Sequence, residues 1–277
     1  MSGATTLEKR LAVLERAADR LTAQASTTWT SPLALADSLG LTLDSWQRDV
    51  LTSPSRQILM LCSRQSGKST VSAVMGLHEA LSVPRSLTLI VSPGERQSGL
   101  LFRTLSRFYR QLGEAVPADI ENRLSLELSN GSAIYALPGI ERTVRGFSSV
   151  NLIIEDEASR VDDALYGAVR PMLAVTGGRI VLASTPFGRR GHFYEEYTKG
   201  GPDWHRVRVT AFDCPRIPRD WLLAERDRIG GWLWDQEFGV EFKDNDDQMF
   251  ASEHVDAALI EGSGPLLLPM FATERAA

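Results

Sequence analysis

The residues with the clearest chemical potential are residues 62–70, Cys-Ser-Arg-Gln-Ser-Gly-Lys-Ser-Thr, which follow the apolar run 58–61. A buried strand that enters a Gly-Lys-Ser turn and continues into a helix predicts a nucleotide site, because successive backbone N–H groups and the helix N-terminus surround the phosphates. In such a turn Lys68 contacts the β- and γ-phosphates, and the Ser69 hydroxyl binds Mg²⁺. Cys62 stands where the usual G-x-x-x-x-G-K-[ST] pattern has its first glycine. The turn alone therefore does not establish a nucleotide site, and other segments must supply the rest of it.

Carboxylates follow a second apolar run. Residues 152–154 lead directly into Glu155, Asp156 and Glu157. Phosphoryl transfer to water needs one carboxylate in the Mg²⁺ shell and another that orients or deprotonates the attacking water. We assign these roles to Asp156 and Glu157, because the second carboxylate then lies just past the strand end. The pair Glu155 and Asp156 remains an alternative.

Two further segments supply groups that suit a nucleotide. The apolar run 180–183 is closed by Ser184 and Thr185, hydroxyls that at the end of a central strand could sense the γ-phosphate. Upstream, the indole of Trp46 and the amide of Gln47 could stack on an adenine and hydrogen-bond to it. Both segments therefore fit the same ligand.

Arginines precede the carboxylate strand at Arg142 and Arg145, and guanidinium groups stabilise charge in phosphoryl transfer. Each feature alone has an ordinary explanation, such as a surface charge, a loop or a helix cap. Their order is more telling, because apolar runs followed by polar residues are what an α/β sheet with its site at the strand carboxyl ends requires. We therefore predict that the chain binds and hydrolyses a nucleotide.

These motifs resemble those of the large terminase subunit of tailed double-stranded DNA bacteriophages, the ATPase that packages DNA into the capsid. The resemblance covers roughly residues 31–250. It rests on residues 46–47, 63–69, 145–146, 153–158, 184–186, 236–238, 241–242 and 249–250. It implies an α/β fold of the P-loop NTPase (ASCE or RecA-like) type, a three-layer sandwich around a mostly parallel central sheet. A short amphipathic N-terminal helix is expected in addition.

The resemblance also implies roles for particular residues, with ATP and Mg²⁺ as cofactors. Nucleotide contacts are implied for Trp46, Gln47, Ser63, Gln65, Ser66, Gly67, Lys68, Ser69 and Thr70, Mg²⁺ ligation for Ser69 and Asp156, catalysis for Glu157, and coupling of hydrolysis to movement for Ala183, Ser184 and Thr185. Two arginine-finger candidates compete. We favour Arg145 acting on a neighbouring subunit, with Arg64 as a sensor of the phosphate state.

The implied partners are duplex DNA gripped by its backbone, the portal and procapsid, the small terminase subunit and further copies of the chain in a ring. Either a separate nuclease chain is a further partner, or the chain is a truncated or split gene product. The implied location is the host cytoplasm, at the procapsid. Family members normally continue into a nuclease domain. The residues after Phe242 are far fewer than the ~100 that a domain needs. We interpret Asp244, Asp246 and Asp247 as a solvated loop and expect no DNA cleavage by this chain.

The overall composition narrows the class of protein. At 277 residues with 43% hydrophobic content, the chain can bury one large core. Its net charge of -5 excludes a general attraction to DNA, so local basic loops are needed, for which Arg189 and Arg190 are candidates. Cys62 and Cys214 fit a reducing cytosol, the histidines show no metal-ligand spacing, and no apolar run suits a membrane span or signal peptide.

Three regions are expected along the chain: an N-terminal amphipathic helix and linker (1–27), the ATPase domain (28–250) and a tail or start of a linker (251–277). Within the domain the patterns predict further elements. These are a strand at 87–91, a helix at 95–112, a hairpin around Asn130-Gly131, and helices at about 70–81, 163–173 and 221–238.

Two alternative functions share the same motifs. A helicase-like DNA translocase would need a second motor domain, for which the chain has no room. A non-catalytic nucleotide-binding remnant predicts a degraded site, whereas Lys68, Ser69, Asp156 and Glu157 are all present.

Overall fold

The computed structural model describes residues 29–140, 144 and 146–243. Within them, eight strands form one sheet in the order β3-β4-β5-β2-β6-β7-β1-β8. The strands are β1 (Gln57–Cys62), β2 (Leu87–Ser92), β3 (Ala118–Glu121), β4 (Ser125–Leu128), β5 (Ala133–Pro138), β6 (Leu152–Asp156), β7 (Arg179–Ser184) and β8 (Trp204–Val209). The six strands from β5 to β8 are parallel, and β3 and β4 add an antiparallel edge. The predicted α/β fold with a mostly parallel sheet is confirmed.

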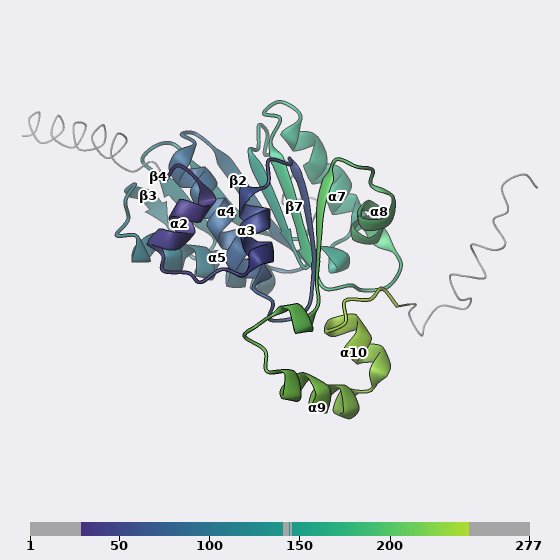
Figure 1. The fold of residues 1–277 in the computed structure, drawn as a ribbon. Helices are drawn as coiled ribbons and strands as arrows, with labels where there is room; N and C mark the ends of the chain where they lie inside the picture. The colour runs from purple at the N-terminus through teal and green to yellow at the C-terminus, as the bar shows by residue number, and fades with distance from the viewer. Residues whose placement is uncertain (1–28, 141–143, 145, 244–277) are drawn as a thin grey trace, which may run out of the picture. The chain divides into compact units, whose positions relative to one another are not determined.

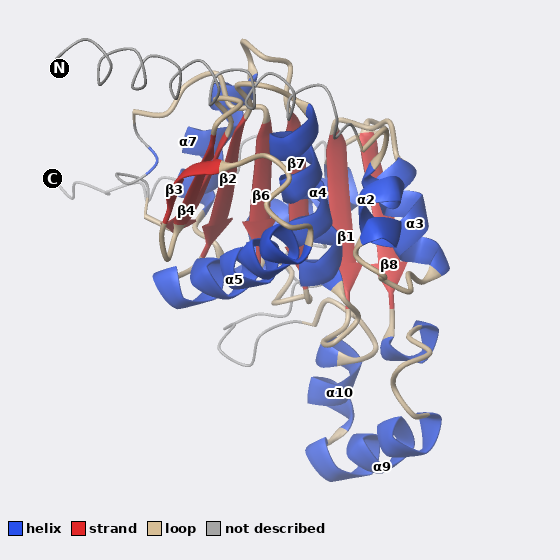
Figure 2. Ribbon diagram, turned by 90° about the vertical axis from the view of Figure 1, so that its left-hand side faces the viewer, coloured by secondary structure: helices blue, strands red, loops and turns tan. Residues whose placement is uncertain are grey.

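Helices cover both faces of this sheet (Figures 1 and 2). One face carries α2 (Pro32–Ser38), α3 (Ser45–Thr52), α4 (Lys68–Ser82) and α5 (Glu95–Gln111), and the other carries α7 (Asp163–Val169), α8 (Gly191–Lys199) and the short 3₁₀ helices η1 (Ala158–Arg160) and η2 (Arg170–Leu173). Strand residues alternate between the two cores: Met60 joins the core of the first face, and Leu59 that of the second. Burial on both faces explains why the central strands are apolar throughout.

The polypeptide after β8 leaves the sheet through η3 (Ala211–Asp213) and forms α9 (Arg219–Ile229) and α10 (Gly231–Glu237) beyond the carboxyl ends of the strands (Figure 2). The single helix predicted at 221–238 is wrong. Gly230 separates the two helices with φ 83° and ψ 151°, a conformation outside the helical region that glycine adopts readily. The break lets α10 return toward the sheet.

The other predicted elements match the structure closely. The hairpin forms between β4 and β5, with Gly131 at φ 83°, and the predicted helix at 163–173 is α-helical to Val169 and then 3₁₀. Pro171 lacks an N–H, which explains the change. The edge strand β8 and helix α8 were not predicted. In the described part of the chain, no helix is long and apolar enough to cross a membrane.

Several predictions fall outside the described residues. Among them are the amphipathic helix within residues 1–27, the loop interpretation of Asp244, Asp246 and Asp247, and the tail at 251–277. They stay predictions.

Candidate nucleotide-binding site

The predicted phosphate turn joins the end of β1 at Cys62 to the start of α4 at Lys68. Within it, Gln65 (φ 58°) and Gly67 (φ 101°) are left-handed, and the Ser66 hydroxyl donates to the Ser63 carbonyl over 2.9 Å. Left-handed residues in a turn direct successive N–H groups into one concavity, the geometry that binds anions. Cys62 itself is the last residue of a paired strand, so the glycine missing from this position is not needed there.

The first turn of α3 lies against this phosphate turn. A Cβ atom at Gly67 would lie 2.5 Å from Nε2 of Gln47, so the close approach requires glycine. The Gln47 amide is fixed because its Oε1 accepts a hydrogen bond from the Asp44 backbone over 2.8 Å. Arg216 bridges the same two elements: it pairs with Asp44 at 2.7 Å and donates to the Ser66 carbonyl at 2.8 Å.

Trp46 does not join them. Its indole packs against the core of the first face, and its Nε1 has no hydrogen-bond partner among the described residues. The structure therefore brings Gln47 to the turn, whereas Trp46 does not line the cavity over it.

A cavity of about 720 Å³ lies over the phosphate turn, within the usual size range of small-ligand sites. It is lined by Arg64, Gln65, Ser66, Gly67, Lys68, Ser69, Thr70, Pro93, Gln97, Glu157, Arg160 and Thr185. Most predicted site residues therefore meet at one place. Three lining residues were not predicted: Pro93 and Gln97 after β2, and Arg160 in η1. The end of β2 is itself a strand carboxyl end, and this signal could have indicated the first two.

The carboxylates reach this cavity across one intervening strand, because β7 lies between β1 and β6. Asp156 ends β6, and Glu157 follows in a left-handed conformation (φ 56°) that places it in the cavity wall. Strand alternation puts Asp156 on the same side of the sheet as α4. Glu155 lies on the other side, where it is 1% exposed and its Oε1 lies 2.7 Å from Nε2 of His192. This arrangement favours the pair Asp156 and Glu157 over the alternative.

Asp156 has the features of a metal ligand. Burial, reinforced by the neighbouring charge of Glu157 and opposed by Lys68, raises the pKa of its carboxyl to about 6. Its Oδ1 is buried with no hydrogen-bond partner among the described residues. A buried carboxylate oxygen is costly unless a cation or donor compensates it. The position therefore fits Mg²⁺, because Glu157, the next residue, lines the same cavity as Ser69.

We expect Asp156→Asn to stabilise the nucleotide-free protein. The pKa rises from 3.8 to about 6 on folding, which costs the folded state about 3 kcal/mol once the group is ionised in both states. This cost is absent below pH 3.8 and complete above about pH 6. In EDTA, the melting temperature of Asp156→Asn should exceed that of the unchanged protein by several degrees at pH 8.

At pH 4.5 most of this difference should disappear, because the wild-type carboxyl is then largely protonated in the folded state. The exposed Asp203 supplies the control, since Asp203→Asn should leave the melting temperature unchanged at both pH values. Equal melting temperatures for Asp156→Asn and the unchanged protein at pH 8 would contradict the burial cost.

Basic groups surround the phosphate position. The Lys68 ammonium donates to the carbonyls of Ser63 (3.1 Å) and Cys62 (3.3 Å). Arg64 reaches away from the turn to Glu237 at the end of α10, with Nε 2.5 Å from Oε2, and its side chain is 61% exposed. Arg160 lies 3.7 Å from the other oxygen of Glu237. Glu237 thus holds two cavity-lining arginines, a contact that the sequence did not indicate.

Arg145, the other arginine-finger candidate, lies outside the described residues. Its assignment stays a prediction.

The segment predicted to couple hydrolysis to movement contacts the residues that follow Glu157. Ala183 pairs in register with Asp156, and the hydroxyls of Ser184 and Ser159 lie 2.7 Å apart. Thr185 is buried and lines the cavity. Beyond it, the Phe187 ring lies under the Arg160 guanidinium, 4.0 Å from ring centroid to Cζ.

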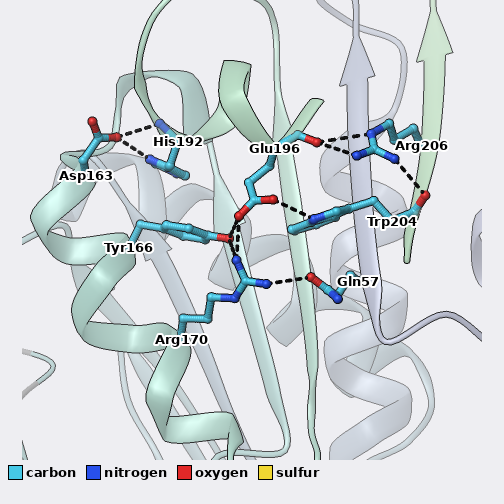
Figure 3. A network of polar contacts seen from close by, with 8 residues as sticks. All are labelled: Gln57, Asp163, Tyr166, Arg170, His192, Glu196, Trp204 and Arg206. Atoms are coloured by element: carbon cyan, nitrogen blue, oxygen red, sulfur yellow. Dashed lines mark hydrogen bonds and ion pairs between the residues drawn. The ribbon is translucent and has the colours of Figure 1, made fainter. Parts of the chain in front are cut away.

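On the opposite side of the sheet a polar network holds α7 and α8 in place (Figure 3). His192 lies between Glu155 and Asp163 and stacks on Tyr166 at 4.3 Å. Glu196 accepts hydrogen bonds from the Tyr166 hydroxyl and from the Trp204 indole, both at 2.8 Å. This network fixes α8 against β6 and β8, and therefore also the segment that joins β7 to α8.

Of the two arginines predicted to grip DNA, Arg189 directs its Nε to the Phe242 carbonyl at 3.4 Å. Arg190 is exposed at the N-cap of α8.

Comparison with known proteins places this geometry in a family. Residues 59–253 match the family model described as terminase large subunit, T4likevirus-type, N-terminal. The chain is 25% identical over 234 residues to the terminase large subunit of Thermus virus P23-45, covering 72% of this chain and 48% of that protein. It therefore spans about half the length of this curated relative.

Solved structures show the same fold. The large terminase ATPase domain of Thermus phage P74-26 superposes with a TM-score of 0.68 at 23% identity, covering 75% of this chain and 97% of that one. The large terminase of another thermophilic bacteriophage, solved in complex with ATP-gamma-S, superposes with a TM-score of 0.60 at 15% identity, covering 73% of this chain and 53% of that one.

Proposed function

Because the chain belongs to the N-terminal family of T4likevirus-type terminase large subunits, we propose that it is an Mg²⁺-dependent ATPase that drives duplex viral DNA into a procapsid. One observation supports this most directly. A single cavity brings the phosphate turn with Lys68 and Ser69 together with Glu157. The thermophilic phage terminase solved with ATP-gamma-S indicates that the fold accepts an adenine nucleotide in that protein.

ATP hydrolysis follows from this arrangement. The triphosphate enters the concavity of the turn, and the Lys68 ammonium exchanges the Cys62 and Ser63 carbonyls for phosphate oxygens. Mg²⁺, held by Ser69 and Asp156, neutralises phosphate charge when bound. Glu157 orients a water molecule for attack on the γ-phosphate and accepts its proton. Gln65, Ser66 and Gly67 supply backbone donors, and Thr70 supplies a hydroxyl. Ser63 supports the turn instead, because its N–H donates to the Val209 carbonyl at 2.8 Å and its hydroxyl to the Arg64 carbonyl at 3.3 Å.

Adenine recognition is assigned to the first turn of α3. Gln47 lies against Gly67, so the base can reach its amide while the phosphates occupy the turn. Trp46, partly buried against the core, is the residue next to Gln47, and its role in stacking on the base stays a prediction.

Phosphate sensing is assigned to Arg64. In the structure its guanidinium pairs with Glu237 of α10, and a γ-phosphate nearby would compete for the same donor. Transfer of Arg64 to the phosphate breaks this ion pair and weakens the attachment of α10 to the turn, which also includes a hydrogen bond from the Arg64 N–H to the Glu237 carbonyl at 3.2 Å. Ala183, Ser184 and Thr185 are assigned to coupling hydrolysis to movement, because Ser184 contacts Ser159, two residues after Glu157. The transition-state arginine is Arg145 of a neighbouring copy.

The packaging role brings partners. We assign duplex DNA held by its phosphates, the portal of the procapsid, the small terminase subunit and further copies of this chain in a ring. The place of action is the host cytoplasm, at the procapsid.

The decisive experiment measures ATP turnover by the purified chain with Mg²⁺, alone and with duplex DNA and procapsids. We expect a slow basal rate, because the finger comes from a neighbour, and strong stimulation on assembly. Lys68→Ala is the control that should abolish both rates. A protein that binds ATP but is not stimulated by DNA or procapsids would contradict the packaging role and leave a nucleotide-binding remnant.

A further inference from the structure

The outer face of α5 carries a straight row of arginines. We name this row the arginine stripe, and it consists of Arg96, Arg103, Arg107 and Arg110, all exposed. At 100° per residue, these four positions fall within about 60° of one another around the helix. The buried side chains of the helix, such as Leu101, Leu105 and Tyr109, lie on the opposite side, against the sheet. The stripe therefore points away from the core.

The length of the stripe suits an extended anionic partner. From Arg96 to Arg110 it spans about 21 Å, at 1.5 Å per residue. Duplex DNA carries one phosphate charge per ~1.7 Å of its axis, so about twelve phosphates lie along this distance. A small ligand would need only one or two of these cations.

Neighbouring loops extend the basic surface. Arg123, between β3 and β4, lies beside the stripe and lines two adjoining hollows of about 400 and 330 Å³ together with Arg103. Arg110 pairs with Glu121 at 2.7 Å, and Arg123 pairs with Glu95. Among the described residues, Arg96, Arg103 and Arg107 have no carboxylate partner. Three unneutralised guanidinium groups in a row stand out on a chain of net charge -5.

We propose that the arginine stripe binds the phosphate backbone of duplex DNA. This inference rests on the proposed packaging function and locates its DNA contact. Guanidinium groups bind phosphate oxygens through paired donors and carry no sequence information when they contact only the backbone. We assign the DNA contact to this surface instead of the segment with Arg189 and Arg190, where the Arg189 side chain donates to the Phe242 carbonyl.

The stripe is also connected to the nucleotide cavity. Gln97, one residue after Arg96, lines that cavity from the first turn of the same helix. A rigid helix with phosphate contacts on its outer face and a cavity residue at its start can convey DNA binding to the hydrolysis site. DNA stimulation of ATP turnover should therefore depend on the stripe.

The test compares Arg103→Ala/Arg107→Ala with the unchanged full-length chain, using the anisotropy of a fluorescent 30-base-pair duplex at several salt concentrations. Each lost phosphate contact should reduce the slope of log K against log [salt] by about 0.9, and two contacts by about 1.8. If the DNA affinities of the two proteins are equal at 1 M salt, the DNA affinity of the variant at 0.1 M salt should be about 60-fold lower than that of the unchanged protein. Stimulation of ATP turnover by the duplex should fall in parallel, and the basal rate should stay unchanged.

The matched control is Arg48→Ala/Arg228→Ala, which removes the same charge from α3 and α9. We expect it to bind DNA like the unchanged protein. Equal losses of DNA affinity in both double variants would indicate a general charge effect and overturn the proposal for the arginine stripe. Normal DNA binding by Arg103→Ala/Arg107→Ala would overturn it as well. In either case DNA binding by the unchanged protein would still support the packaging function. Absence of DNA binding by the unchanged protein would overturn both proposals.

Discussion

Glu157→Gln is expected to lower ATP turnover by about 10²–10⁴-fold, the contribution of a well-placed general base. Glutamine keeps the size of the side chain but cannot accept the proton of the attacking water. Glu157 lines the cavity but is not part of the phosphate turn, so ATP affinity should change by no more than a few-fold. Steady-state turnover and equilibrium binding of a fluorescent ATP analogue would measure the two effects separately.

The natural control is the adjacent carboxylate. Glu155 is buried on the far side of the sheet against His192, and glutamine can keep a hydrogen bond there. Glu155→Gln should therefore retain turnover within about tenfold of the unchanged protein, a loss from positioning alone. A result in which Glu155→Gln is inactive and Glu157→Gln is active would restore the alternative pair Glu155 and Asp156.

Arg145→Ala is expected to lower assembled ATP turnover by about 10³–10⁵-fold, the typical effect of removing an arginine finger. The described neighbours of this position are a buried Val144 and Gly146, which has φ 114°. If the finger acts on the next copy, the loss should appear only where copies assemble. The slow basal rate of the monomer should be insensitive to the substitution.

Mixing two inactive proteins tests this arrangement. Arg145→Ala subunits keep Glu157, and Glu157→Ala subunits keep Arg145, so a mixed assembly contains some complete sites. Partial recovery of turnover on mixing is therefore expected, with each variant alone as the control. Without recovery, the finger would act within its own chain, and Arg64 would be the candidate because it already lines the cavity.

Much of the site could be predicted because it follows local rules. Gly67 and Lys68 lie between a strand and a helix, a sequence arrangement that by itself produces the phosphate turn. Likewise, the apolar run before Asp156 predicts a buried strand, and carboxyl ends of parallel strands meet at one edge. These features depend on neighbours within a few residues. The same locality explains why the hairpin at Asn130-Gly131 could be predicted.

The sequence-based predictions failed where contacts between distant residues determine the structure. The helix predicted over 221–238 has favourable residues on both sides of Gly230, and only the return of α10 toward the turn shows why it breaks there. The edge strand β8 was not predicted, although residues 206–209 alternate polar and apolar side chains, which is a signal of a half-buried strand. Its pairing with β1 is visible only in the tertiary structure.

The amino-acid sequence alone determined the α/β class, the phosphate turn and the order, along the chain, of the strands that carry the polar residues. Hydrophobic periodicity, glycine conformation and the polar residues at strand ends depend on neighbours in the sequence, so they can be predicted from the sequence. Only the tertiary structure decided that Glu155 and Asp156 lie on opposite sides of the sheet, that Glu237 binds Arg64, and that Gln47 contacts Gly67. These contacts join residues far apart in the chain, and they form only when the sheet brings their elements together.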